Sequence, residues 1–399
     1  MASPIRILTA VPICDGHDSA INTINLEFIR HGIEVIYLGY HRSVGDIVRA
    51  AIQEDVRAIG ISSYNGGHIE FFAEVVDLLR KRGADYIKVF GGGGGTITHE
   101  DAAAMKQRGV EQIFFAGTSL DDMVGFVRQR YGKPRGKRAR AKTPDIELAQ
   151  RLTEIEESYG KGKRRVPAPE IQNTKAEIRN SKVIGFTGPG GAGKTTLIDE
   201  LVLRFLNKDR QLRKGSRAES RIAILSHDPS VIGEGALLGD RATMINSQDD
   251  RVFMRSMATR GQAGGLSPAT HDCLALLAKS NFDHVIIETV GTGQEAMPFR
   301  QNGIVDLTVL VMNPDYGSRL QLQKIVMLDL ADIVVVNKSD LQRARTAHSE
   351  IEQRLEQNRR AQRLIDTVAK RHRDSGVDGL FDLISGGERS HRVKARKKS

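Results

Sequence analysis

The residues best suited to chemistry form a glycine-rich run that ends in lysine and threonine. Gly188-Pro189-Gly190-Gly191-Ala192-Gly193-Lys194-Thr195 matches G-x-x-x-x-G-K-[ST], follows a strand-like segment and precedes an amphipathic helical pattern at 197–206. Backbone N–H groups of such a loop surround a β-phosphate, its lysine reaches the β and γ oxygens, and its threonine hydroxyl ligates Mg²⁺. Lys194 is also a candidate catalytic residue. We expect nucleotide phosphates to contact Gly188, Gly190, Gly191, Ala192, Gly193, Lys194, Thr195 and Thr196.

A second motif indicates which base is bound. Asn337-Lys338-Ser339-Asp340 follows the apolar run 333–336 and resembles the N-K-x-D element of G proteins. An aspartate there accepts hydrogen bonds from guanine N1 and N2, a pattern that adenine cannot offer, and an unmatched buried carboxylate would penalise ATP. We therefore expect GTP to be favoured over ATP, with Asn337, Lys338 and Asp340 contacting the base.

Three acids follow predicted strands at positions suited to Mg²⁺ and to control of the attacking water. They are Asp228, Asp240 and Glu288, and we expect them to join Thr195 at the magnesium site. Asp228 and Glu288 are also candidate catalytic residues. Glu288 stands where ordinary G proteins have the aspartate of D-x-x-G, so Gly291 is the candidate backbone contact to the γ-phosphate. A helix cap or a surface charge is the alternative for each acid taken alone.

Short apolar runs alternate with segments of helical period, which is typical of strand-helix units around a parallel sheet. In residues 1–131 they predict a flavodoxin-like, doubly wound sheet with strands at 5–10, 34–38, 58–62, 86–90 and 112–116. A second α/β domain, of the P-loop GTPase type, is expected over 181–388, with strands at 182–187, 221–226, 284–288, 307–312 and 333–337. Residues 132–180 are expected to form a basic linker with one helix near 146–159, and residues 389–399 a basic tail.

The charge pattern argues against a nucleic-acid partner. Positive charge behind the net +10 is concentrated at 133–142, 161–165 and 389–399, stretches without aromatic residues for base stacking, so we expect a solvated linker and tail. No apolar run reaches the roughly 18 residues of a membrane span, and the first residues show no signal pattern, so we expect a cytoplasmic protein without a membrane partner. Only two cysteines occur, Cys14 and Cys273, and they support neither a disulfide framework nor a metal site.

Further motifs in the second domain resemble one class of G protein. The chain contains Asp228-Pro229-Ser230, Gly239-Asp240-Arg241, Arg260-Gly261 before Gly264-Gly265-Leu266, and Glu288-Thr289-Val290-Gly291-Thr292-Gly293-Gln294. Together these segments resemble the G-protein chaperones of adenosylcobalamin-dependent acyl-CoA mutases. The resemblance implies a GTPase that acts on the loading of a cobalamin cofactor.

The first domain carries the matching cofactor signature. Asp15-Gly16-His17-Asp18-Ser19-Ala20 resembles the D-x-H-x-x-G signature of cobalamin-binding domains, although Ala20 replaces the usual glycine. The resemblance implies that His17 ligates cobalt and that Asp15 accepts its other ring N–H, which fixes the tautomer. It also implies that the nucleotide tail of cobalamin lies along the sheet edge, against Ser62, Gly91, Gly92 and Gly93. Tyr64 stands where the related S-x-L motif has leucine, which alters the wall of that site.

A cobalamin domain followed by this G domain resembles the amino-terminal part of fused isobutyryl-CoA mutases, in the methylmalonyl-CoA mutase family. The resemblance implies adenosylcobalamin and Mg²⁺ with GTP as cofactors, and a complete enzyme that is a homodimeric isomerase. The acyl-CoA-binding barrel of that family is absent from this chain, so it would be the missing carboxy-terminal part or a separate subunit. One alternative is a stand-alone cobalamin-binding or delivery GTPase that serves a separate mutase. Another is a cobalamin carrier for methyl transfer, which would require a methyltransferase partner.

Overall fold

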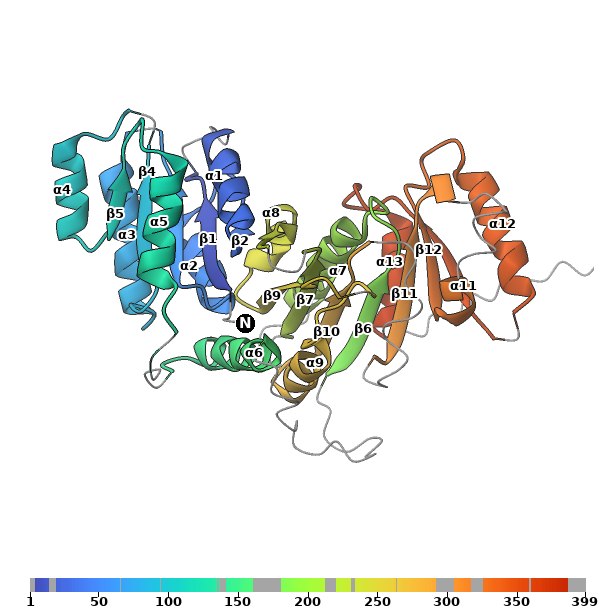
Figure 1. Cartoon of the computed structure of the whole chain (residues 1–399). Helices are drawn as coiled ribbons and strands as arrows, with labels where there is room; N and C mark the ends of the chain where they lie inside the picture. The colour runs from blue at the N-terminus through green and yellow to red at the C-terminus, as the bar shows by residue number, and fades with distance from the viewer. Residues whose placement is uncertain are drawn as a thin grey trace, which may run out of the picture.

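The computed structural model describes residues 4–13, 19–64, 66–93, 95–134, 136, 141–160, 181–211, 220–230, 234–262, 264–291, 305–316, 326–358 and 360–386. These residues form two α/β bodies, each built around one sheet, and helix α6 (Pro144–Gly160) runs beside both at their junction (Figure 1). No helix in these ranges is long and apolar enough to cross a membrane. The predicted segments at 15–18, 161–165, 292–294 and 389–399 lie outside the described residues.

The first sheet is parallel and has the strand order β5-β4-β3-β1-β2-β8. Its first five strands are β1 (Ile5–Ala10), β2 (Ile33–Tyr37), β3 (Ala58–Ser62), β4 (Lys88–Gly92) and β5 (Gln112–Phe114). One face packs against α1 (Ser19–Arg30) and α5 (Leu120–Tyr131), and the other against α2 (Val44–Gln53), α3 (His68–Lys81) and α4 (His99–Gln107). The order 2-1-3-4-5 is that of the flavodoxin-like fold, as predicted.

The second sheet is also parallel, in the order β13-β12-β11-β6-β10-β7-β9. Its strands are β6 (Lys182–Thr187), β7 (Ile222–Asp228), β9 (Val252–Ala258), β10 (His284–Glu288), β11 (Leu307–Met312), β12 (Ile333–Asn337) and β13 (Arg363–Thr367). The helices that cover it are α7 (Lys194–Gln211), α9 (Thr270–Lys279), α11 (Val326–Leu330), α12 (Ala344–Glu356) and α13 (Ser375–Ile384). This arrangement agrees with the P-loop GTPase type of sheet predicted from the sequence.

The sequence pattern does not indicate three strands, β8 (Ala236–Leu238), β9 and β13. Strand β8 has only three residues, too few for a periodic signal. Strand β9 is buried along its whole length although it includes an arginine and a serine, and β13 has a partly exposed, mixed polar sequence. These strands depend on tertiary partners, which a local pattern does not reveal.

Strand β8 joins the two bodies. It comes from the second half of the chain, between β7 and β9, yet it pairs in parallel with β2 of the first sheet, with Val35 opposite Leu237. The short helices α8 (Asp240–Thr243) and η1 (Ile245–Gln248) then lead back to β9. Gly235, just before β8, packs so closely on β2 that a Cβ would overlap the backbone of Ile33. The first sheet is therefore completed by the GTPase half of the chain.

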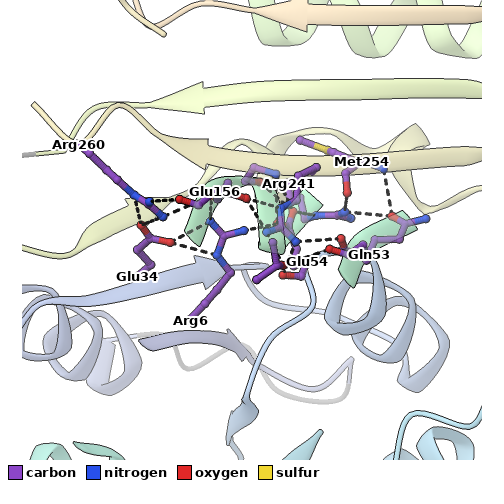
Figure 2. A network of polar contacts seen from close by, with 12 residues as sticks. Arg6, Glu34, Gln53, Glu54, Glu156, Arg241, Met254 and Arg260 are labelled. Carbon is purple, nitrogen blue, oxygen red and sulfur yellow. Dashed lines mark hydrogen bonds and ion pairs between the residues drawn. The ribbon is translucent and has the colours of Figure 1, made fainter. Parts of the chain in front are cut away.

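Seven charged side chains meet between the two bodies (Figure 2). The seven are Arg6, Glu34, Glu54, Glu156, Arg241, Arg255 and Arg260. Each of them except Arg260 exposes less than a tenth of its side chain. Helix α6 contributes Glu156, whose carboxylate pairs with Arg6 at 2.9 Å and with Arg255 at 2.6 Å. Burial raises the pKa of Glu156, but Arg6, Arg255 and Arg260 outweigh this effect and lower the pKa to about 2.

We expect Glu156→Gln to destabilise the protein by about 3–5 kcal/mol at pH 7, because Arg6, Arg255 and Arg260 lose a shared carboxylate and the buried cluster is left with four arginines and two carboxylates. A lowered carboxyl pKa gives stability that is present above the unfolded value of 4.5 and is lost as the pH falls toward 2. The difference from the wild type should therefore shrink over that interval. Urea unfolding of both proteins at several pH values measures this difference in stability. Arg30→Gln, which removes a pair whose arginine is 73% exposed, is the control and should cost less than about 1 kcal/mol.

Candidate functional site

The glycine-rich loop connects β6 to α7 and is held from two sides. The N–H of Gly190 donates to the carbonyl oxygen of Gly291 at 2.8 Å. On the other side, Asn337 Nδ2 donates to the carbonyl oxygen of Ala192 at 2.8 Å. The structure therefore brings the predicted phosphate loop, the predicted γ-phosphate contact and the predicted base-binding element into one site.

Within the loop, glycine is required by the backbone. Gly188, Gly191 and Gly193 have φ values of 138°, 72° and 88°, in the region that side chains rarely adopt. A Cβ at Gly188 would also overlap the backbone of β11. Lys194 is buried at the start of α7 and donates from Nζ to the carbonyl oxygens of Gly188 and Pro189 at 3.0 and 3.3 Å. Its ammonium group is thus held inside the curve of the loop, where phosphates are expected.

The predicted magnesium residues lie together beside this loop. Asp228 ends β7, Glu288 ends β10 and Asp240 begins α8. Thr195 donates from Oγ1 to Glu288 Oε1 at 2.8 Å, and Ser226 Oγ donates to Asp240 Oδ2. Thr196, the next residue of α7, is exposed.

Burial raises the pKa values of all three acids, and neighbouring carboxylates add to the shift for Asp228 and Glu288. Burial and the charge of Asp240 raise the pKa of Glu288 to about 8, although Lys194 and the Thr195 hydroxyl oppose the shift. Burial, with the charges of Asp240 and Glu288, raises the pKa of Asp228 well above its ordinary value. Burial also raises the pKa of Asp240. The cluster therefore has an excess of buried negative charge that a cation would relieve.

The donor set fits Mg²⁺. Hard divalent cations prefer carboxylate and hydroxyl oxygens, and Mg²⁺ is commonly held by one or two carboxylates together with phosphate oxygens. Asp228 Oδ2 and Glu288 Oε2 are buried and have no hydrogen-bond partner among the described residues. Unpartnered buried oxygens are costly unless a ligand satisfies them. The residues present are thus suited to a magnesium ion between the acids and the phosphate loop.

His227 supports the acids and is not predicted from the sequence. Its Nδ1 lies 2.9 Å from the carbonyl oxygen of Glu288 and its Nε2 lies 2.8 Å from Thr270 Oγ1. Burial lowers the pKa of His227 to about 4, so the ring is neutral, with Nδ1 the donor and Nε2 the acceptor. The histidine fixes the end of β10 against α9. Its position directly before Asp228 is the one local signal for such a role.

The base-binding element is organised by β13, which the sequence analysis misses. Asn337 Oδ1 accepts hydrogen bonds from Thr367 Oγ1 at 3.0 Å and from the N–H of Ala369 at 3.1 Å. These bonds leave its Nδ2 directed at the phosphate loop. Thr367 ends β13 beside the end of β12, and only the pairing of those strands reveals the contact.

The predicted guanine-reading carboxylate lies at the surface of the same edge. Asp340 Oδ2 pairs with Lys370 Nζ at 2.6 Å, a contact that holds the pKa of Asp340 below its usual value. Lys338 has a φ of 59°, so the backbone turns sharply between Asn337 and Asp340. The turn separates the two side chains, one directed at the loop and one outward.

The first sheet has a cavity of about 200 Å³ at its carboxyl edge. Strands β3, β4 and β5 form one wall and helices α1 and α5 the other, and the lining is mostly apolar. Ser62 and Thr118 contribute hydroxyl groups. Size and lining fit a flat aromatic heterocycle with a few polar atoms, such as the benzimidazole of a cobalamin tail.

The predicted glycine run lines this cavity and also has a structural role. A Cβ at Gly91, Gly92 or Gly93 would overlap the backbone of the neighbouring strand or loop at Ile61, Phe114 or Ser63. Larger residues would therefore disturb the sheet as well as fill the cavity. Tyr64, which follows Ser62 closely in the sequence, is exposed. The predicted cobalt ligand His17 and its partner Asp15 lie outside the described residues.

Comparison with known proteins yields two family matches. Residues 148–397 match the family described as methylmalonyl Co-A mutase-associated GTPase MeaB. Residues 5–122 match the family described as B12 binding domain.

Curated relatives match nearly the whole chain or a large part of it. A fused isobutyryl-CoA mutase of Geobacillus kaustophilus is 37% identical over 401 residues, covering 94% of this chain and 36% of that protein. One from Cupriavidus metallidurans is 38% identical over 404 residues, with 96% and 36% covered. A putative GTPase of Pyrococcus abyssi is 34% identical over 275 residues, covering 62% of this chain and 80% of that protein. The chain thus spans about a third of the length of the fused mutases that it matches.

We expect the metal-free protein to lose thermal stability as the pH rises from 5 to 8. The pKa of Glu288 is about 8 in the folded protein and 4.5 ordinarily, so its contribution is present below the lower value and lost as the pH rises through the higher one. Thermal unfolding in EDTA measures this effect, and Mg²⁺ with GDP should restore more stability at pH 8 than at pH 5. Glu288→Gln should flatten the profile. The same fall in the variant as in the wild type would contradict our assignment.

Proposed function

The chain belongs to the family of methylmalonyl-CoA mutase-associated GTPases and carries a B12-binding domain in front of its GTPase domain, and we propose that it is the adenosylcobalamin-binding and GTP-hydrolysing part of a fused acyl-CoA mutase. In this proposal the GTPase domain controls the loading and protection of the cofactor in the cytoplasm. The complete enzyme would be a homodimer that rearranges isobutyryl-CoA to n-butyryl-CoA on an acyl-CoA-binding barrel.

One observation carries the proposal of cofactor control. Strand β8, between the acids Asp228 and Asp240, is also the outermost strand of the cobalamin domain's sheet. A movement of these acids can therefore reach that sheet, because the strand that pairs with it lies between them in the chain. A GTPase that was merely tethered to a cobalamin domain would not need to contribute a strand to that domain's sheet.

The GTPase site has a residue for each task in phosphoryl transfer. Lys194 and the loop N–H groups would hold the β- and γ-phosphates, and the Gly291 N–H would contact the γ-phosphate. Thr195, Asp228, Asp240 and Glu288 would hold Mg²⁺, which supplies charge neutralisation at the phosphates when bound. Asp228 and Glu288 are also our candidates for the acid that orients the attacking water.

The cobalamin site divides its tasks in a similar way. His17 would ligate cobalt and Asp15 would hold its tautomer, while the cavity beside Ser62 and Gly91–Gly93 would enclose the displaced benzimidazole. The Co–C bond supplies the radical chemistry when adenosylcobalamin is bound. Substrate selection would lie in the barrel, as a further part of the polypeptide or as a separate subunit.

We expect Lys194→Ala to lower GTP hydrolysis by at least about 10²–10³-fold, because phosphate charge in the transition state loses its ammonium partner. Cobalamin binding by this variant should be unchanged. We expect His17→Ala to hydrolyse GTP normally but to lose the spectrum of imidazole-ligated cobalamin. A phosphate-release assay and absorption titration with adenosylcobalamin, with and without Mg²⁺ and GTP, measure both properties.

The titrations also test the proposed control. A GTP-dependent change in cobalamin affinity is expected in the wild type and should disappear in Lys194→Ala. Absence of cobalamin binding by the wild type would refute the cofactor assignment, and loss of both properties in either variant would refute two separable sites.

A further inference from the structure

Asp240, one of the proposed magnesium ligands, lies in a short segment whose two ends contact the cobalamin domain. The segment runs from Gly235 through β8 and α8 to Thr243. At its start the N–H of Gly235 donates to the carbonyl oxygen of Ile29 in α1 at 2.8 Å, and β8 pairs with β2. At its end, Arg42 of the cobalamin domain donates to the carbonyl oxygen of Ala242 at 2.8 Å. Both flanks of Asp240 are thus held by the other domain.

Arg241, the residue after Asp240, is the deepest of these anchors. It is fully buried and donates from Nε to Glu54 Oε1 at 2.6 Å (Figure 2). Its terminal nitrogen donates to Gln53 Oε1 at 3.0 Å and to the carbonyl oxygen of Met254. Glu54 and Gln53 stand at the end of α2 in the cobalamin domain. A helix of one turn cannot fix its own position, so these contacts determine where α8 lies.

Glu54 is anchored in turn on the GTPase sheet. Its carboxylate accepts from the N–H of Ser256 at 3.0 and 3.1 Å and from Ser256 Oγ at 3.0 Å. Gln53 adds two bonds to the edge of β9, donating to the carbonyl oxygen of Val252 at 2.8 Å and accepting from the N–H of Met254 at 3.2 Å. The carboxylate of Glu54 therefore connects β9 rigidly to Arg241, and through it to Asp240.

We propose that Glu54, a residue of the cobalamin domain, is a positioning residue of the GTPase metal site and acts through Arg241 on Asp240. The inference rests on the proposed magnesium role of Asp240. It means that the cobalamin domain sets the metal affinity of the GTPase. By reciprocity, metal and nucleotide binding tighten the contact between the two domains.

The physical reason is the charge balance at Arg241. A buried guanidinium that loses its carboxylate partner is strongly destabilised and moves toward water. Such a movement would carry α8, and with it Asp240, away from Ser226 and the other acids. Changes to residues that orient metal ligands typically cost 10–100-fold in metal affinity.

Mn²⁺ titrated into the GDP-bound chain, followed by electron paramagnetic resonance, measures metal affinity without turnover. We expect Glu54→Gln to weaken Mn²⁺ binding about 10–100-fold and to leave GDP affinity in EDTA unchanged, because the phosphate loop and base-binding element are intact. General structural damage would lower both affinities. Asp250→Asn is the matched control, since it removes a pair with Arg49 across the same junction at an aspartate that is 79% exposed. The control should bind Mn²⁺ like the wild type.

The outcomes separate this inference from the proposed function. A wild type that binds no Mn²⁺ with GDP would refute the GTPase metal site itself. A folded Glu54→Gln variant with wild-type Mn²⁺ affinity would overturn only the positioning role. If Glu54→Gln does not fold, Arg42→Gln replaces it, because that variant removes the bond to Ala242 together with a bond inside the cobalamin domain, to the carbonyl oxygen of Leu38. A several-fold loss of Mn²⁺ affinity in Arg42→Gln supports the proposal, and unchanged affinity overturns it.

Discussion

An edge strand carries backbone N–H and C=O groups that need hydrogen-bond partners, and the junction of this molecule is built to satisfy two such edges. The first sheet would end at β2, and β8 covers it. The second sheet ends at β9, and the backbone groups on the outer edge of β9 are satisfied by the side chains of Gln53, Glu54 and Arg241. Each body thus depends on the other to complete its sheet. Polar bonds of this kind fix one relative placement more narrowly than an apolar contact would.

The same junction lies next to a site that is electrostatically incomplete. The carboxylates of Asp228, Asp240 and Glu288 are buried beside each other, and their pKa values are raised by burial and, for Asp228 and Glu288, by the neighbouring carboxylates. By contrast, Glu156 has three arginine partners and a lowered pKa. The difference separates two kinds of buried charge. The arginine-paired cluster holds the domains together, whereas the cluster of acids is suited to bind a cation and to respond to it.

The sequence was sufficient for the family and the two α/β sheets, because these depend on contiguous motifs and periodic patterns. The P-loop and N-K-x-D element each depend on backbone conformation within one turn, so short windows contain the necessary information. The residue-level roles assigned to the phosphate loop, the N-K-x-D element, the acids, His17 and the glycine run remain predictions. The contacts of the junction were not predicted, because Glu54 and Arg241 are 187 positions apart and the motif that contains Arg241 gives no sign of a partner in the first domain. Thr367 and Ala369 were missed for the same reason, because only strand pairing brings them to Asn337.

The pairing of β8 with β2 has a consequence for the order in which the protein is made. Glu34 is opposite Ala236, so the partner of the first domain's outer strand leaves the ribosome some 200 residues later. At ordinary rates of synthesis, about 5–20 residues per second, this delay lasts roughly 10–40 s. During that interval the nascent first domain can form its own helices and five strands but keeps one strand without its neighbour. Translation speed therefore determines how long the growing chain is open to pairing with other nascent chains on the same messenger.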